Sequence, residues 1–123
     1  MSNLVKEITM LRFGFLITAM AIALNAFGYH MLRSVLSPKE LSMFETASRY
    51  FLFGGLWVMI IGLAQFHITL SEKGVRFVIL GLCLFCGSLF LYLLFHVKLL
   101  MFITPIGGLL MMIGFILLFF VKK

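Results

Sequence analysis

Two cysteines three positions apart are the first candidates for chemistry. Cys83 and Cys86 have the spacing of a dithiol redox site. In such sites the pair lies at a helix N-terminus, where the helix dipole and polar surroundings stabilise a thiolate. Both cysteines here lie in the middle of a long apolar run, so we expect neutral, unreactive thiols. The pattern therefore favours close helix packing by small residues over redox or metal chemistry.

Polar residues inside apolar segments form the second group of candidates, because each is costly in a membrane and needs a reason. Ser88, Tyr92 and His96 follow one another at four-residue steps and so share one helix face. Glu45 and Arg49 have the same spacing, which suits an ion pair along a helix. We expect these and similar residues to gather near one end of the molecule, and we call the set the polar cluster. Its members are Asn25, His30, Glu45, Arg49, Tyr50, Ser88, Tyr92, His96 and Thr104.

The polar cluster has two interpretations. Intramembrane polar side chains commonly act as hydrogen-bonding contacts between helices, and we favour this interpretation. The other is a functional site, either part of a transport path or a haem or metal site formed by His30 and His96. A histidine at a helix end is more often an interfacial hydrogen-bonding group, and we see neither a nucleophile beside a base nor two close carboxylates. We therefore expect no enzyme, no metal and no cofactor.

The elements that position these residues follow from the composition. Hydrophobic residues make up 63% of the 123 residues and charged residues 11%, against about 45–50% and about 25% in soluble domains. Four segments are long enough to span a bilayer, at about 13–32, 50–69, 75–96 and 99–121. Continuous apolar runs without a two-residue period exclude a β-barrel. We predict an all-α polytopic membrane protein, a single domain over residues 1–123 that forms an antiparallel bundle of four transmembrane helices.

The first connection carries a local helix signal. Residues 37–40, Ser-Pro-Lys-Glu, match a capping box and predict a helix that begins at Pro38. The first turns are amphipathic, so we expect an interfacial helix before the second span. A straight helix from Pro38 to Thr69 would be roughly 48 Å long, against a hydrocarbon core of roughly 30 Å. It must protrude, tilt or break, and Gly54-Gly55 is the easiest place for a bend.

Small residues at helical spacing predict where the helices approach closely. Ala19 and Ala23 form one such pair, and Cys83 and Gly87 form another. Pro105 should kink the last helix, because it removes one backbone hydrogen bond. The full set of predicted packing residues is Ala19, Ala23, Gly28, Cys83, Gly87, Gly107, Gly108 and Gly114.

The basic residues give a weak orientation signal and no nucleic-acid site. Ten Lys and Arg against four acidic residues give a formal charge of +6, but the cations are scattered between apolar runs rather than gathered in a stripe. Six of them fall on the side of the termini, including Lys122-Lys123, and four on the other side. The bias favours a plasma-membrane protein with both termini in the cytoplasm.

Several stretches resemble the YgdD-like family of small bacterial inner-membrane proteins. They are residues 25–32 (Asn-Ala-Phe-Gly-Tyr-His-Met-Leu), Glu45-Thr46-Ala47 with Tyr50, Gly87-Ser88-Leu89 and residues 104–108 (Thr-Pro-Ile-Gly-Gly). The resemblance covers nearly the whole chain and implies a four-helix inner-membrane protein whose molecular function is not established. Family members carry a histidine four residues after the tyrosine that Tyr50 matches, whereas this chain has Gly54. That departure argues against a metal site in the polar cluster.

Three classes of function are compatible with these features. The leading hypothesis is an accessory or structural component without a catalytic site, which packs against a larger membrane complex or against itself in contact with membrane lipids. The alternative is oligomeric transport of a small solute, ion or lipid along the polar cluster, which needs several copies because four helices enclose almost no lumen. A third class is haem or metal binding by His30 and His96.

Overall fold

The protein consists of four long helical rods joined by short connections. The computed structural model describes residues 2–121. The first rod is α1 (Ser2–Ala23), which continues through a π-helical stretch, η1 (Leu24–Gly28), into the short α2 (Tyr29–Leu32). The other rods are α3 (Pro38–Ala64), α4 (Glu72–Phe95) and α5 (Leu99–Phe119). Each rod is long and apolar enough to cross a membrane. The prediction of an all-α, four-helix membrane fold is confirmed.

Two helix ends differ from the prediction by five residues or more. The first rod already begins at Ser2, well before the apolar run that starts at residue 13, because Glu7 and Leu11 pack against α3 and hold the polar turns in the helix. The helix α3 ends at Ala64, whereas the second predicted span ends at residue 69. Gln65 forms the C-cap of α3. The start of α3 agrees with the sequence, because Ser37 and Glu40 form both hydrogen bonds of the predicted capping box.

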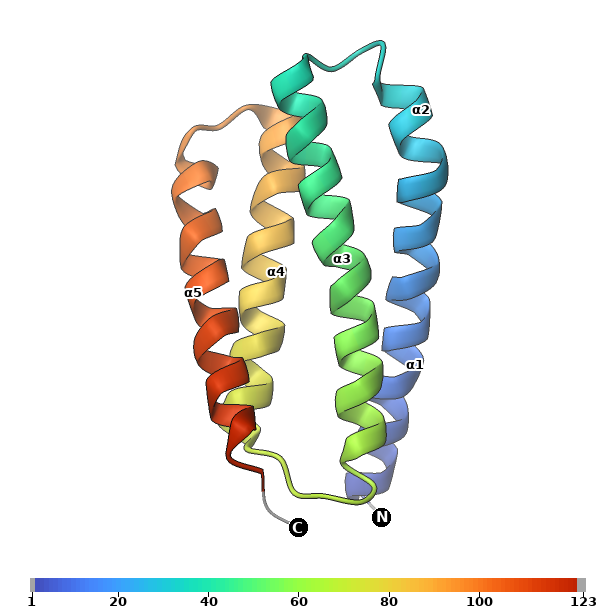
Figure 1. The fold of residues 1–123 in the computed structure, drawn as a ribbon, viewed down its shortest axis with the longest axis vertical. Helices are drawn as coiled ribbons and strands as arrows, with labels where there is room; N and C mark the ends of the chain where they lie inside the picture. The colour runs from blue at the N-terminus through green and yellow to red at the C-terminus, as the bar shows by residue number, and fades with distance from the viewer. Residues whose placement is uncertain (1, 122–123) are drawn as a thin grey trace.

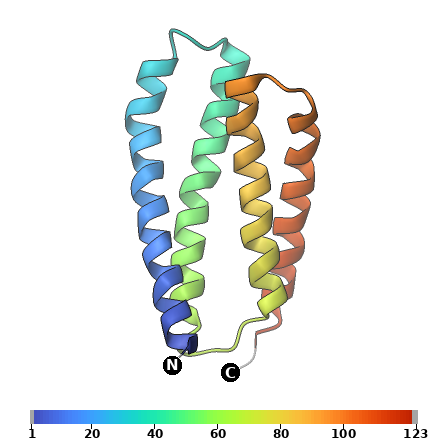
Figure 2. The same cartoon turned by 180° about the vertical axis from the view of Figure 1, so that it is seen from behind.

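The four rods stand side by side in a row in the order α1, α3, α4, α5 (Figures 1 and 2). Within the described chain, the backbone of α1 approaches α3 but neither α4 nor α5. The largest clusters of buried side chains lie between α3, α4 and α5, around Val78 and around Leu82. The start of α1 and the end of α5 lie at one end of the row and the α2–α3 and α4–α5 connections at the other (Figure 1). We call these the terminus end and the loop end.

The contact between α1 and α3 is a seam of small residues. Gly14, Ala21 and Gly28 follow at seven-residue steps along the first rod, and Gly55 and Gly62 repeat the step on α3. A Cβ added at Gly55 would lie 2.8 Å from the backbone nitrogen of Thr18, and one at Gly62 would lie 3.1 Å from that of Leu11. The absence of side chains thus lets the two backbones touch.

The contact between α4 and α5 is built in the same way. Gly74 and Gly81 on α4 face Gly114 and Gly107 on α5, again at seven-residue steps. A Cβ on Gly81 would lie 2.6 Å from the carbonyl oxygen of Gly107, and one on Gly114 would lie 2.7 Å from the backbone nitrogen of Val78. A seven-residue repeat keeps the same face of each helix turned toward its neighbour over its whole length.

The sequence predicts that the helix beginning at Pro38 protrudes, tilts or breaks, and the structure shows that it does not break. The helix runs unbroken through Gly54 and Gly55, because both glycines are buried at contacts: Gly54 receives the side chain of Leu82, and Gly55 meets α1. The turns before residue 50 do not form a separate interfacial helix but are the beginning of α3 itself. Phe44 and Ala47 are buried there, which draws this segment into the protein.

Two of the predicted packing pairs lie outside the seams. Ala19 and Ala23 are exposed on the side of α1 that faces away from α3, because the seam follows the seven-residue series of Gly14 instead. Cys83 is exposed, and a Cβ on Gly87 would meet nothing within 4 Å.

The remaining predicted packing residues lie at helix contacts of different closeness. A Cβ on Gly28 would lie 2.7 Å from the ring of Phe44, and Gly107 and Gly114 are buried in the α4–α5 seam. Gly108 makes only an ordinary contact with Phe85. Pro105 lies inside α5, which remains one continuous helix from Leu99 to Phe119.

Candidate functional site

The structure joins part of the polar cluster in contacts between neighbouring rods. The first contact links η1 to α3. Ser48, which is only 1% exposed, donates from its hydroxyl to the Asn25 side-chain oxygen over 3.2 Å. The Asn25 amide nitrogen donates in return to the Ser48 carbonyl oxygen over 3.3 Å and to the Ala21 carbonyl over 2.7 Å. Asn25 and Ser48 thus hydrogen-bond to each other in both directions, at the part of the α1–α3 seam nearer the loop end.

The second contact links α4 to α5. The buried Ser88 hydroxyl hydrogen-bonds to the Thr104 hydroxyl. Nearby, the buried Cys86 thiol donates to the Ala47 carbonyl oxygen of α3 over 3.6 Å. A neutral thiol that donates to a backbone carbonyl is a packing group, which agrees with the expectation of unreactive cysteines. The two cysteines remain unbonded to each other, and one is exposed while the other is buried.

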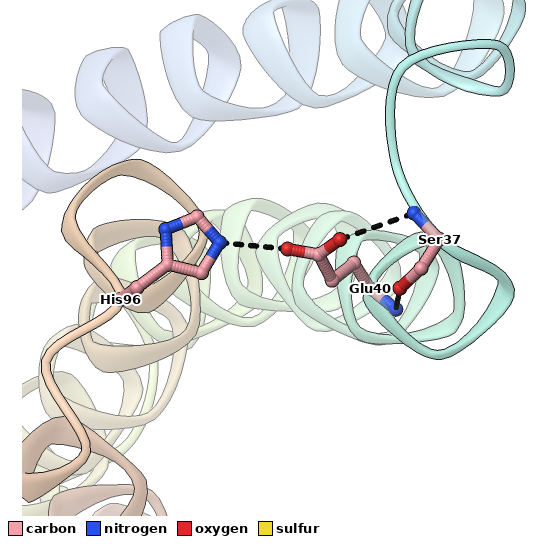
Figure 3. A network of polar contacts seen from close by, with 3 residues as sticks. All are labelled: Ser37, Glu40 and His96. Atoms are coloured by element: carbon pink, nitrogen blue, oxygen red, sulfur yellow. Dashed lines mark hydrogen bonds and ion pairs between the residues drawn. The ribbon is translucent and has the colours of Figure 1, made fainter.

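The third contact links α4 to the start of α3, as Figure 3 shows. The carboxylate of Glu40 uses one oxygen for the backbone nitrogen of Ser37, at 3.1 Å, and the other for Nε2 of His96, at 2.7 Å. His96 is the C-cap of α4 and has left-handed backbone dihedrals, φ 56° and ψ 33°. The ring of Tyr92 packs against the His96 ring, with 5.6 Å between the centroids. We call the Glu40–His96 contact the clasp, since it joins the two connections at the loop end.

Other members of the polar cluster are not brought into this arrangement. Within residues 2–121, Glu45 and Arg49 do not form the predicted ion pair, and Arg49 is exposed. His30 is exposed and its ring lies against the neighbouring Tyr29. Tyr50 packs on Phe85 of α4, with 4.8 Å between the ring centroids.

The geometry does not support a metal site in the cluster. Among the described residues, no three His, Cys, Asp or Glu side chains are close enough together to hold a metal ion. His96 already uses its Nε2 for Glu40, and His30 lies on a different rod. These contacts satisfy hydrogen-bonding groups between neighbouring helices. They thereby fix the register of each helix pair.

Sequence reasoning missed the partners Ser48 and Glu40. Ser48 precedes Gly55 and Gly62 by one and two seven-residue steps, and this repeat is the signal that could have placed it on the α1–α3 seam. Glu40 was assigned only to the capping box. Nothing local to residues 37–40 indicates a partner 56 positions away.

A second group of polar residues lies at the terminus end. Lys6 of α1, Gln65 after α3, and Glu72 and Arg76 of α4 line a groove of about 480 Å³ between α1 and α4. An adjoining cavity of about 230 Å³ shares the first three of these residues. The side-chain oxygen of Gln65 is buried and has no hydrogen-bond partner among the described residues. An orphaned buried acceptor is uncommon in folded proteins and requires an explanation.

The comparisons with known proteins point to one family. A model described as "Protein of unknown function (DUF423)" matches residues 24–108. A UPF0382 membrane protein of Staphylococcus aureus (strain bovine RF122 / ET3-1) is 38% identical over 106 residues, which cover 85% of this chain and 87% of the relative. UPF0382 membrane proteins of Staphylococcus haemolyticus and Staphylococcus saprophyticus are 37% and 35% identical over the same length, covering 85% of this chain and 87% and 88% of the relatives. The search of solved structures finds no significant match. The chain is a membrane protein that belongs to the DUF423 family.

Proposed function

We propose that this protein is a non-catalytic accessory component of the membrane that packs against another membrane protein or a second copy of itself. The observation that carries the proposal is the position of α1 at the edge of the row, with α3 as its one backbone neighbour in the described chain. The side of the first rod opposite that seam exposes Ala19 and Ala23 in α1 and Ala26 in η1.

Exposed alanines on a membrane helix support a protein neighbour in a specific way. Helices in lipid gain nothing from hydrophobic association, so they associate where small residues let their backbones approach. Ala19 and Ala23 are four residues apart and Ala26 follows three residues later, so one approaching helix can contact all three. Large side chains such as Phe15 and Ile22, both more than half exposed, flank this strip.

The test is a variant that blocks close approach without touching the fold. Ala19→Leu with Ala23→Leu adds bulk only to the exposed side, so the variant should keep its helicity and melting temperature. Met20→Leu with Ile22→Leu is the matched control, because it changes neighbouring exposed residues without adding volume. Affinity purification in mild detergent should return a stoichiometric companion or a homo-oligomer with the parent and the control, but not with the double leucine variant. A monomer without companion from the parent protein would contradict the proposal.

Transport through the polar cluster is the less favoured function. The members that could line a path are paired across the seams instead, as Asn25 is with Ser48 and Ser88 is with Thr104. Such contacts support a packing role. Proteoliposome flux that depends on His30 and Arg49, two exposed members that form no hydrogen bond to another rod in the described chain, would reverse this preference.

We also propose a plasma-membrane location with both termini in the cytoplasm, within the YgdD-like branch of the family. The position of the start of α1 and the end of α5 at the same end supports it (Figure 1), as does the excess of basic residues on that side. Lys122 and Lys123, which contribute to this excess, lie outside the described residues. A fluorescent reporter fused after residue 123 should be active only if that end is cytoplasmic, and an alkaline phosphatase fusion should be inactive.

A further inference from the structure

Two charged side chains lie at the depth where the rest of the protein is uncharged. The other three rods carry no Asp, Glu, Lys or Arg over residues 13–32, 77–97 and 99–121. The 21 residues of α5 span about 31 Å as a helix, close to the roughly 30 Å of a hydrocarbon core. On α3, the corresponding stretch contains Glu45 and Arg49. An ionised side chain in a membrane span is costly and needs a partner.

The depth of Arg49 follows from the residue next to it. Tyr50 packs its ring on Phe85 of α4, and the backbone of Phe85 approaches α5 so closely that a Cβ on Gly107 would lie 2.5 Å from its nitrogen. Gly107 is eight residues after Leu99, the first residue of α5, and two residues before the middle of that helix. Arg49 therefore leaves the backbone about 12 Å below the start of α5 and about 3 Å from its midpoint.

Neither charge has an ion-pair partner within residues 2–121. Arg49 is exposed and Glu45 is half-buried, and the two side chains do not meet although they are one turn apart. A pair within one chain would also leave the arginine incompletely satisfied. Its guanidinium has five N–H donors, and one carboxylate takes two of them in a bidentate contact. The remaining donors would face lipid, so further acceptors must come from outside the chain.

We propose that this face of α3 packs against the same face of a second copy of the protein, with Arg49 of each copy bound to Glu45 of the other. The two copies have the same orientation in the membrane, so a twofold axis along the membrane normal relates them. Four residues of helix separate the two charges by about 6 Å along the axis, a distance that an extended arginine side chain covers. The four groups then alternate in sign around the axis, and their net charge is zero.

The apolar part of the same face supports a parallel helix as the partner. Arg49, Phe53, Leu56, Ile60 and Leu63 follow one another at alternating steps of four and three residues. The four apolar side chains are 38% to 61% exposed. Alternating steps of this kind form a straight stripe, along which two parallel helices pack over their whole length. Lipid would also accept the apolar side chains, so it is the two charges that identify the occupant.

This contact goes beyond the one proposed for the first rod. The α3 face is separate from the strip of Ala19, Ala23 and Ala26, which stays open when two α3 helices pair. The double leucine variant of that strip should therefore keep the α3 pair and lose only the neighbour that the strip holds. Each contact can thus fail while the other stands.

The first test is disulfide cross-linking of the full chain in native membranes. Leu56→Cys places a thiol on the α3 stripe, and the matched control Ile113→Cys places one at an exposed site of α5. Both are made with Cys83→Ser, because Cys83 is exposed whereas Cys86 is buried. Mild oxidation should convert the Leu56→Cys protein into a covalent dimer and leave the control monomeric. Absence of this dimer, or an equal yield from the control, would overturn the proposal.

Charge reversal tests the ion pairs themselves. Arg49→Glu gives a chain with two carboxylates on this face and Glu45→Arg gives one with two cations, so each alone should lose the cross-link through Leu56→Cys. When the two variants are coexpressed with different tags, cross-linking between them should return, because every arginine then faces a glutamate. Unchanged cross-linking in the single variants would mean that lipid or another protein satisfies the charges. Rescue only when both reversals are in one chain would mean a pair within the chain. Either result refutes pairing between copies.

Discussion

Gly81→Ala should weaken the protein far more than the same substitution at Gly87 of the same helix. At Gly81 the new Cβ would lie 2.6 Å from the Gly107 carbonyl oxygen and from the Met111 nitrogen, both of them backbone atoms of α5. Ordinary contact begins at 3.4 Å, so α4 and α5 must separate by the difference, about 0.8 Å. At Gly87 the Cβ meets nothing within 4 Å.

The magnitudes follow from these distances. A radial gap of about 0.5–1 Å forfeits roughly a quarter to a half of the dispersion energy of each atom pair, and overpacking a tight site typically costs about 1–3 kcal/mol. Gly81→Ala should therefore lower the free energy of unfolding by about 1–3 kcal/mol. Gly87→Ala should raise it by about 0.5–1 kcal/mol, because alanine loses less backbone entropy than glycine when a helix forms.

The assay is unfolding in mixed micelles as the fraction of dodecyl sulfate rises, followed by helix circular dichroism. Both variants change a glycine to alanine in α4, so helix propensity cancels in the comparison and the steric effect of the seam remains. Equal stability of the two variants would refute the backbone-to-backbone contact between α4 and α5. A Gly107→Ala variant should behave like Gly81→Ala, since its Cβ would lie 2.8 Å from the Gly81 carbonyl oxygen.

The remaining predictions concern the polar contacts at the loop end. Ser48→Ala should cost about 1 kcal/mol, the typical net value of a hydrogen bond, and Asn25→Ala should cost less in that background than in the parent protein; additive costs in the same unfolding assay would contradict the bridge. His96→Asn keeps a residue that tolerates left-handed backbone but loses the clasp, so it should lower the melting temperature slightly, as expected for an exposed contact. Glu40→Ala should cost more than His96→Asn, because it removes the capping box as well, and the opposite order of melting temperatures would argue against a shared carboxylate.

Local signals were sufficient for the fold. The lengths of the apolar runs identify four membrane helices, and residues 37–40 identify the start of α3 through a capping box that involves only near neighbours. These features depend on the solvent and on contacts within one helical turn. The sequence is therefore informative about them even without knowledge of the tertiary structure.

The choice of packing face could not be made from sequence in the same way. Lipid-facing residues such as Phe15 and Leu16 are as apolar as those between helices, so hydrophobicity does not mark the inner face. Small residues are then the remaining indication of the packing face. Ala19 and Ala23, at four-residue spacing, indicate one face of the first helix, whereas Gly14 and Ala21, at seven-residue spacing, indicate another. The structure uses the seven-residue series, which is the repeat that keeps two nearly antiparallel helices in contact over their full length.

For a related reason, the sequence predicts the members of the polar cluster only in part. The four-residue stripe that includes Ser88 and His96 follows from helix geometry, but their partners Thr104 and Glu40 depend on how the helices are placed side by side. Polar residues that are costly to place in a membrane can be identified in a sequence from their residue type. Which of them meet depends on helix rotation and register, and these are set by the glycine seams.

The two glycine seams have a consequence for how the chain is made. Every residue of the α1–α3 seam, from Gly14 to Gly62, has been synthesised before α4 enters the bilayer. The first hairpin can therefore pack while the ribosome is still translating the second, and the second needs no residue of the first for its own seam. The halves then dock mainly through side chains such as Leu82 and Val78, which makes assembly of the whole protein the joining of two finished parts.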